Sequence, residues 1–250
     1  MENFSMDVVL TVLSYIGVVA FSVSGAMVAI RSEVDIFGVV LMSVITSFGG
    51  GLLRDTILNR YPYPALFEMK YEFICCIATS LIVFALAAFF RDAYLKRERL
   101  VENINNILDS IGLSAFAVTG TQSAMRIMFE NRAQPLAAVA IVMGMISCIG
   151  GGLMRDVILG KLPWVLKKRI YAIAALAGSG AYVLLGRWMA QESLAMLIAC
   201  VIVFALRMCA TIFRWDMPVA IRFSELDKPQ RHFTLIRRER EVRARDMEEK

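Results

Sequence analysis

Histidine, paired cysteines and clustered metal ligands are nearly absent from this sequence of 250 residues. Its one histidine, His232, lies in the polar C-terminal stretch. The cysteines all lie inside apolar segments, without a C-x-x-C pair, so we interpret them as small buried hydrophobic residues. They are Cys75, Cys76, Cys148, Cys200 and Cys209. No set of nucleophile and base can be recognised either. These absences argue against an enzyme, and we expect neither a cofactor nor a metal site.

Polar sequence is scarce before residue 214. Hydrophobic residues make up 58% of the chain and the mean hydropathy is +0.62, whereas ordinary soluble domains are roughly 45–50% apolar. Residues 1–213 contain 17 of the 27 lysines and arginines, which gather at the ends of apolar runs. Because membrane proteins use positive charge in this way, we expect membrane lipids as partners and no nucleic acid.

Seven stretches approach the length of about 20 mostly apolar residues that a spanning helix needs. They cover residues 8–30, 36–58, 71–90, 104–125, 135–159, 168–188 and 193–213. The sequence therefore predicts an all-α membrane protein with seven transmembrane helices. The start of the chain has no basic segment, so we expect the first span to be retained rather than cleaved as a signal.

The basic residues of the loops predict the orientation of the chain. One face carries Arg31, Arg91, Lys96, Arg97, Arg99, Lys161, Lys167, Lys168 and Arg169, and the opposite face carries Arg60, Lys70, Arg126, Arg132 and Arg187. By the positive-inside rule the richer face is cytoplasmic, which puts the N-terminus outside and the C-terminus inside. Residues 214–250 then form a charged cytoplasmic tail. We interpret the tail as a solvated or surface-lying helix, with specific binding of anionic lipids as the alternative.

The chain contains an internal repeat. The segment "VLSYIGVVAFSVSGA" (12–26) matches "ILDSIGLSAFAVTGT" (107–121), and "FGGGLLRDTIL" (48–58) matches "IGGGLMRDVIL" (149–159) at eight of eleven positions. The repeats cover residues 8–90 and 104–188, and the helix over 193–213 is left over. Because each repeat contains three spans, the second enters the membrane from the opposite side. This predicts inverted topology about a pseudo-two-fold axis in the membrane plane.

Each repeat carries three consecutive glycines inside an apolar run, and an Arg-Asp pair follows. The residues are Gly49, Gly50, Gly51, Arg54 and Asp55 in the first repeat, and Gly150, Gly151, Gly152, Arg155 and Asp156 in the second. Since glycine weakens a helix, we expect the second and fifth helices to be broken here, with free helix ends that face protein or water. The ions then line or gate an aqueous path. The alternative is that they only tie the repeats together through ion pairs and helix capping.

Further polar residues within the spans are weaker candidates for a pore lining. Ser43, Thr46, Ser47 and Ser147 precede the glycines, and Asp109 lies in the fourth span. Hydroxyl side chains in spans more often bond the local backbone or pack helices, whereas a carboxylate in a span is rarer. We interpret Arg207, in the last span, as reaching toward the cytoplasmic surface.

The paired motifs "GGGLLRD" and "GGGLMRD", with "GVVAFSVSG" and "GLSAFAVTG", resemble the prokaryotic TRIC family, relatives of the trimeric intracellular cation channels. The same domain has also been catalogued as a putative glycine transporter. The resemblance covers residues 8–213. It implies a homotrimer in the cell inner membrane, with a pore for K⁺ and Na⁺ through each protomer. It also implies that the two triple-glycine sites are kinks and that Arg54 and Arg155 are associated with the pore. The Lys-Glu-Val motif of the animal members is missing from this sequence.

Two principal functions therefore remain open. The first is a monovalent cation channel, and the second is a secondary transporter of a small zwitterionic amino acid such as glycine. A membrane assembly protein without transport activity is a third. Two arginines and two helix N-termini at mid-depth would by themselves favour anions, so cation passage requires Asp55, Asp156, Asp109 or carbonyl groups to outweigh them.

Overall fold

The computed structural model describes residues 2–131, 134, 136–167, 170–213 and 215. Every regular element within those residues is a helix. The elements are α1 (Glu2–Ile30), α2 (Ile36–Ile57), the 3₁₀ helix η1 (Ala65–Phe67), α3 (Lys70–Phe89), α4 (Arg91–Lys96), α5 (Glu98–Glu130), α6 (Ala137–Ile158), α7 (Trp164–Lys167), α8 (Tyr171–Trp188) and α9 (Glu192–Ile212). The predictions for the tail from residue 216 onward lie outside the described residues.

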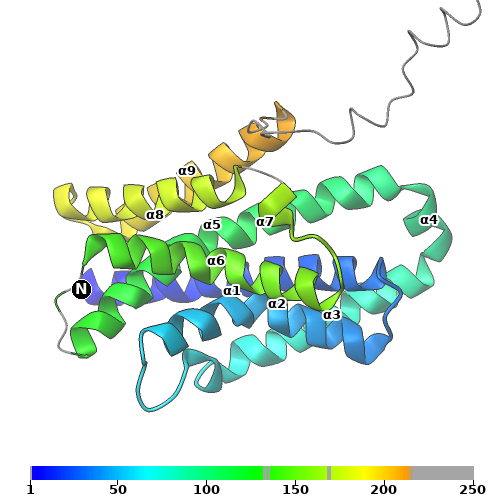
Figure 1. Cartoon of the computed structure of the whole chain (residues 1–250), viewed down its shortest axis with the longest axis horizontal. Coiled ribbons are helices and arrows are strands. Elements are labelled where there is room, and N and C mark those ends of the chain that lie inside the picture. The colour runs from blue at the N-terminus through cyan, green and yellow to red at the C-terminus, as the bar shows by residue number, and fades with distance from the viewer. Residues whose placement is uncertain (1, 132–133, 135, 168–169, 214, 216–250) are drawn as a thin grey trace, which may run out of the picture. The chain divides into compact units, whose positions relative to one another are not determined.

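The seven long helices coincide with the seven predicted spans, with ends that differ by a few residues in most cases. Figure 1 shows them side by side and alternating in direction. We call the end where α1 begins and α2 finishes the Asp55 end, and the opposite one the Asp156 end. Since the number of long helices is odd, α1 starts at the Asp55 end and α9 finishes at the Asp156 end.

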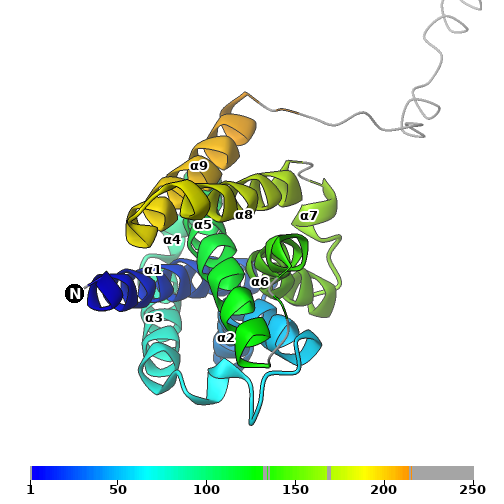
Figure 2. The same ribbon diagram turned by 90° about the vertical axis from the view of Figure 1, so that its left-hand side faces the viewer.

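Five of the long helices are long and apolar enough to cross a membrane, namely α1, α2, α3, α6 and α9. The other two, α5 and α8, belong to the second repeat. Helix α5 carries Asn105, Asn106 and Asp109, and all three side chains are buried. It packs against α1, α6, α8 and α9, and Figure 2 shows it in the middle of the helices. Its polar residues therefore face protein, which explains why its hydropathy is lower than that of its neighbours.

Local sequence explains where α2 and α6 end. Shortly after the end of α2 the chain reaches Asn59, which has a φ of 52°. Shortly after the end of α6 it reaches Gly160, which has a φ of 65°. A residue in the left-handed region commonly terminates a helix, and Asn and Gly adopt it at the lowest cost. The two residues occupy equivalent positions of the repeat. Next in each repeat comes a proline, Pro62 or Pro163, which stops the helix from resuming at once.

Contacts between the repeats show the predicted inverted two-fold relation. A Cβ atom at Gly17 on α1 would lie 3.0 Å from the Phe116 ring on α5, and a Cβ at Gly112 on α5 would overlap the Phe21 ring on α1. The two rings contact each other with centroids 5.3 Å apart. Because Gly17 and Gly112 are equivalent in the repeat, as are Phe21 and Phe116, each glycine makes room for the other repeat's phenylalanine. The inverted-repeat prediction is confirmed.

The predicted breaks in the second and fifth helices are wrong. Both α2 and α6 run as uninterrupted α-helices through Gly49–Gly51 and Gly150–Gly152, so the backbone groups there are bonded within the helix. The glycines serve close packing instead. A Cβ at Gly50 would overlap the carbonyl oxygen of Ser147, and a Cβ at Gly151 would overlap that of Thr46. The lack of side chains thus lets the backbones of α2 and α6 touch where the two repeats cross.

Helix α9 lies outside the repeats and covers α5 and α8. Its buried face carries Ala195, Met196 and Ala199, which belong to a core cluster with Tyr182 of α8 and Val118 of α5. The single helix outside the two repeats therefore stabilises the second repeat. It also brings a buried arginine, Arg207, to the Asp156 end.

Candidate functional site

At the Asp55 end, Arg54 and Asp55 form a buried ion pair. The Nε atom of Arg54 donates to Oδ1 of Asp55 at 2.8 Å, and Nη2 lies 2.6 Å from the same oxygen. The second carboxylate oxygen accepts from the backbone N–H of Ala65 at 2.7 Å and lies 3.5 Å from Nη1 of Arg60. Asp55 therefore balances the charge of Arg54 and fastens η1 to the end of α2.

At the Asp156 end the second repeat builds a similar pair. The Nε atom of Arg155 donates to Oδ1 of Asp156 at 2.9 Å, and Nη2 lies 2.9 Å from that oxygen. Nη1 of Arg155 also donates to Oγ of Ser24 on α1, at 3.4 Å. Both charged side chains are almost completely enclosed, with exposures of 2% and 3%. Ions at such depth are costly unless they are paired, and here the neighbouring residue supplies the partner.

Adjacent residues on a helix do not normally face each other, because their side chains diverge by about 100°. The Arg-Asp pairs form because the long arginine side chain bends back over its own helix. The third glycine of each triplet borders this space. A Cβ at Gly51 would lie 3.9 Å from Nη2 of Arg54, and one at Gly152 would lie 3.8 Å from Nη2 of Arg155. Within each triplet, then, one glycine packs the helices tightly and another lies beside the guanidinium.

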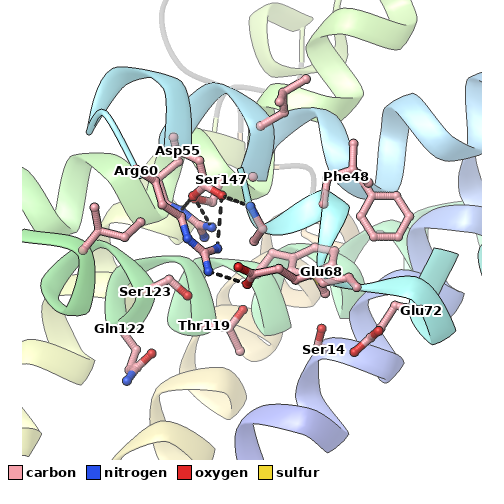
Figure 3. Close-up of a pocket in the computed structure, with 18 of the residues that line it drawn as sticks. Ser14, Phe48, Asp55, Arg60, Glu68, Glu72, Thr119, Gln122, Ser123 and Ser147 are labelled. Atoms are coloured by element: carbon pink, nitrogen blue, oxygen red, sulfur yellow. Dashed lines mark hydrogen bonds and ion pairs between the residues drawn. The ribbon is translucent and has the colours of Figure 1, made fainter. Parts of the chain in front are cut away.

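A cavity of about 350 Å³ opens next to the Arg54–Asp55 pair, between α1, α2, α5 and the loop after α2. We call it the Asp55 cavity. Of the residues singled out from the sequence, it is lined by Ser47, Gly51, Arg54, Asp55 and Ser147. Figure 3 shows Ser14, Glu72, Thr119, Gln122 and Ser123 around the same space, with dashed lines that join Asp55, Arg60 and Glu68. The structure thus gathers polar groups from five helices (α1, α2, α3, α5 and α6) and a loop around one cavity.

The remaining predicted residues do not line this cavity. Asp109, Arg155 and Asp156 lie toward the Asp156 end. Ser43 donates to the carbonyl oxygens of Val39 and Ser22, at 2.9 and 3.1 Å, and Thr46 donates to that of Met42 at 2.6 Å. Both hydroxyl groups are buried between helices. Their bonding matches the alternative considered from the sequence, in which hydroxyl side chains satisfy local backbone.

Ser47 and Ser147 border the cavity and also bond the backbone. Ser47 donates to the carbonyl oxygen of Val18 at 3.3 Å, and Ser147 donates to that of Met143 at 2.7 Å. An oxygen that donates its proton to the backbone keeps its lone pairs for another partner. These two hydroxyl groups can therefore accept from water, or coordinate a cation, within the cavity.

The prediction that Arg207 reaches toward the membrane surface is wrong. Its side chain is 2% exposed, its Nη2 lies 3.8 Å from Oδ2 of Asp109, and its guanidinium lies 4.6 Å from the centroid of the Tyr171 ring. These contacts join α9, α5 and α8. Arg207 therefore lies opposite the carboxylate of Asp109 inside the protein, and the aromatic face of Tyr171 further stabilises the cation.

Several lining residues of the Asp55 cavity were missed in the sequence because they lie in loops or at helix ends. Arg60 bonds Oε2 of Glu68 through Nη2 at 2.7 Å, and Arg126 pairs with Glu130 through Nε at 2.9 Å. The repeat does mark position 60 as basic, because Lys161 is the equivalent of Arg60 in the second repeat. Nothing local marks Glu68, Glu72 or Gln122, since short-range sequence does not show which loop or helix lies opposite them.

Comparisons with known proteins agree with this structure. A family model described as "Glycine transporter" matches residues 11–88 and 106–187. The Bacillus subtilis membrane protein YvgT is 36% identical over 206 residues, covering 82% of this chain and 94% of that protein. The Escherichia coli inner membrane protein YadS is 32% identical over 168 residues, covering 66% of this chain and 73% of the relative.

Solved structures show the same fold. The crystal structure of a prokaryotic TRIC channel in 0.5 M KCl has a TM-score of 0.73 at 29% identity, covering 85% of this chain and 100% of that one. The TRIC orthologue from Rhodobacter sphaeroides has a TM-score of 0.71 at 32% identity, covering 83% and 99%. The family model spans both repeats. This chain therefore belongs to the membrane-protein family described as glycine transporter, and it has the fold of the prokaryotic TRIC channels.

Proposed function

We propose that this protein is a homotrimeric channel for monovalent cations such as K⁺ and Na⁺, with one pore in each protomer. The Asp55 cavity is the mouth of that pore at one end. From there the path continues beside α2 and α6 toward Arg155 and Asp156. Support comes from the TRIC channels among its structural neighbours and from the polar cavity built on the repeated motif.

The balance of charge in the Asp55 cavity carries this proposal. Four carboxylates and three guanidiniums line it, from Asp55, Glu68, Glu72, Glu130, Arg54, Arg60 and Arg126. Because Arg54 is paired with Asp55, its charge is not left free to attract anions. Glu72 makes no ion pair within the described part of the chain. A net negative, partly enclosed lining raises the local concentration of cations, since low-dielectric walls focus the field.

The unbroken helices remove the second argument for anions. Free helix N-termini near mid-depth would have presented N–H groups and a positive dipole end to a ligand. In α2 and α6 those N–H groups are bonded within the helix. Of the arginines and free helix N-termini that favoured anions on sequence grounds, only the two arginines remain. Each of them has a carboxylate beside it.

Transport of a zwitterionic amino acid such as glycine is the second candidate, and the description of the matching family favours it. The same cavity contains both signs of charge, with Arg60 and Glu72 as groups for a carboxylate and an ammonium. A carrier binds its substrate stoichiometrically and changes conformation in each cycle, whereas an open channel passes many ions. The two functions therefore differ in a direct measurement.

Planar-bilayer recording of the purified protein tests the proposal. Unitary current steps, with a reversal potential that follows a K⁺ gradient and ignores a Cl⁻ gradient, are expected of the cation channel. Saturable glycine counterflow in proteoliposomes without unitary currents would instead establish the carrier. Cross-linking or mass measurement in detergent tests the trimer separately, so that oligomeric state and transport are not confused.

A further inference from the structure

A second cavity lies at the Asp156 end, apart from the proposed pore. It has a volume of about 480 Å³ and lies between the end of α1, the end of α3, α4 and the start of α5. It shares no lining residue with the Asp55 cavity. We call it the α3–α4 cavity. Its lining includes Arg31, Glu33, Phe84, Arg91, Tyr94 and Glu98.

The four charged side chains of this cavity do not neutralise one another. Within the described residues, neither arginine lies within 4.0 Å of a carboxylate oxygen. The Nη2 atom of Arg31 instead donates to the backbone carbonyl of Glu98 at 3.0 Å, which positions the guanidinium and leaves its other N–H groups available. The cavity therefore presents separate cationic and anionic groups.

The hydroxyl group of Tyr94 adds an unsatisfied donor. Its oxygen is enclosed and has no hydrogen-bond partner within the described part of the chain. Arg31 and Tyr94 line the same cavity. Burial raises the pKa of this phenol, and the Arg31 guanidinium opposes that rise. Enclosing a hydroxyl group without a partner costs free energy, so an unpaired example calls for a ligand or water that accepts from it.

The remaining wall of the cavity is apolar. Phe84, Ala87 and Ala88 contribute it from the last two turns of α3. The outward side of the same helix end is exposed, with Leu86 at 53%, Phe89 at 89% and Phe90 at 63%. The chain then turns directly into α4 with Arg91. An apolar span that is followed by a charged turn typically ends at the level of the lipid headgroups.

We propose that the α3–α4 cavity binds a phospholipid whose headgroup carries a phosphate and a primary ammonium, as phosphatidylethanolamine does. The phosphate accepts from Arg31, Arg91 and the Tyr94 hydroxyl. The ammonium donates to the carboxylates of Glu33 and Glu98, and an acyl chain follows Phe84 down α3. This site does not depend on whether the pore conducts cations.

Other occupants match the lining less well. An anionic lipid without an amine leaves the two carboxylates without a partner. A quaternary ammonium has the charge but no N–H group to donate to them. A free amino acid carries both charges, but it leaves the apolar wall of Phe84 and its neighbours uncovered.

Native mass spectrometry of the full-length protein, stripped of lipid and titrated with dioleoyl lipids, tests the proposal. Phosphatidylethanolamine is expected to bind about fivefold more tightly than phosphatidylcholine or phosphatidylglycerol, and Tyr94→Phe to weaken it about tenfold by removing one hydrogen bond to a charged group. The double variant Arg31→Gln/Arg91→Gln should abolish the preference. Arg187→Gln, an exposed arginine at the other end of the molecule, is the matched control and should bind as the wild type.

Two results would overturn the assignment. Equal binding of the three lipids, unaffected by Tyr94→Phe, would mean that the cavity does not bind the lipid headgroup. This would be the result if a neighbouring protomer covers the cavity. Competition by excess glycine against the lipid would identify the ligand as a free zwitterion. Both results can be obtained whether or not the protein conducts ions.

Discussion

At the scale of single residues, the four buried ions of the repeated motif are the most demanding feature of the chain. An isolated charge in an apolar interior loses its hydration, and attraction to one partner repays this only with good geometry. Arg54 with Asp55, and Arg155 with Asp156, meet that condition with N–O distances of 2.6–2.9 Å. The sequence places donor and acceptor side by side, so neither ion depends on a distant element for its partner.

Asp156→Asn should therefore destabilise the protein strongly, because it leaves Arg155 buried without its carboxylate. We expect a loss of about 3 kcal/mol, the lower range for breaking a buried pair. The double variant Arg155→Gln/Asp156→Asn should cost less than the sum of the single variants. Unfolding of the purified protein in an SDS titration measures all three.

Arg126→Gln is the matched control for this experiment. Its pair with Glu130 is exposed, at 69% and 49%, and should contribute only about 0–1 kcal/mol. If Asp156→Asn costs no more than Arg126→Gln, the buried pair contributes nothing specific to the fold. Reduced unitary current in Asp156→Asn protein that remains folded would additionally connect the pair to the pore.

The two Arg-Asp motifs can be recognised in the sequence, whereas the buried position of Arg207 cannot. The motifs are visible because they repeat, and repetition is a property of the sequence itself. Arg207 stands near the end of an apolar run, where a long cation ordinarily reaches for water. Its actual surroundings, Asp109 and Tyr171, come from helices far away in the chain. Only the tertiary arrangement shows that a buried partner was available.

At the scale of elements, the crossing of α2 and α6 depends on particular glycines within each triplet. Gly50→Ala would force the two backbones apart, since the new methyl group would overlap the Ser147 carbonyl. We expect a loss of about 3 kcal/mol or failure to fold, as for overpacking in a tight core. Gly51→Ala should be tolerated, because its nearest neighbour is 3.9 Å away, and alanine favours a helix by about 1 kcal/mol over glycine.

Thermal unfolding of the two variants in detergent measures this difference. The comparison is well matched, because both changes add one methyl group to adjacent positions of the same helix. Similar stabilities for Gly50→Ala and Gly51→Ala would contradict the proposed packing. So would a stability gain in Gly50→Ala, which would mean that the helices are free to separate.

The spanning helices could be predicted from the sequence, but whether the triple glycines break them could not, for a physical reason. A run of about 20 apolar residues has few alternatives to a spanning helix, so length alone identifies it. Three glycines within such a run are compatible with two outcomes, a broken helix or a close helix crossing. The choice is made by the partner helix, here through Ser147 and Thr46, and no local pattern reports it.

At the scale of the whole molecule, the odd number of long helices predicts that the two termini lie on opposite sides of the membrane. The basic loops further predict an N-terminus outside and a C-terminus in the cytoplasm. Reporter fusions at each end, one active only in the cytoplasm and one active only outside, measure this directly. A cytoplasmic signal from both ends would contradict the alternation of α1 to α9 across the membrane.

The two ends of the proposed pore differ in charge although the repeats match in sequence. The Asp55 cavity has four carboxylates against three guanidiniums, including Glu68 and Glu72. In sequence, residues 159–170, which are equivalent to the segment that carries Glu68, include four basic residues, among them Lys161, and no acidic residue. Fixed charge at a pore mouth enriches or depletes cations locally. If the pore conducts cations as proposed, it should pass them more readily from the Asp55 end.

Current–voltage curves in symmetrical dilute KCl test this asymmetry. We expect cation current entering from the Asp55 end to be about twofold larger than current in the reverse direction, an effect of the unequal mouth potentials that salt should screen at high concentration. Glu72→Gln should reduce the asymmetry, because it removes one negative charge from the Asp55 cavity, and Arg187→Gln should leave the curve unchanged. Labelling a Glu72→Cys variant with an impermeant thiol reagent from one chamber assigns the direction. A linear wild-type curve in dilute salt would show that the mouths do not control entry, even in a protein that is a cation channel.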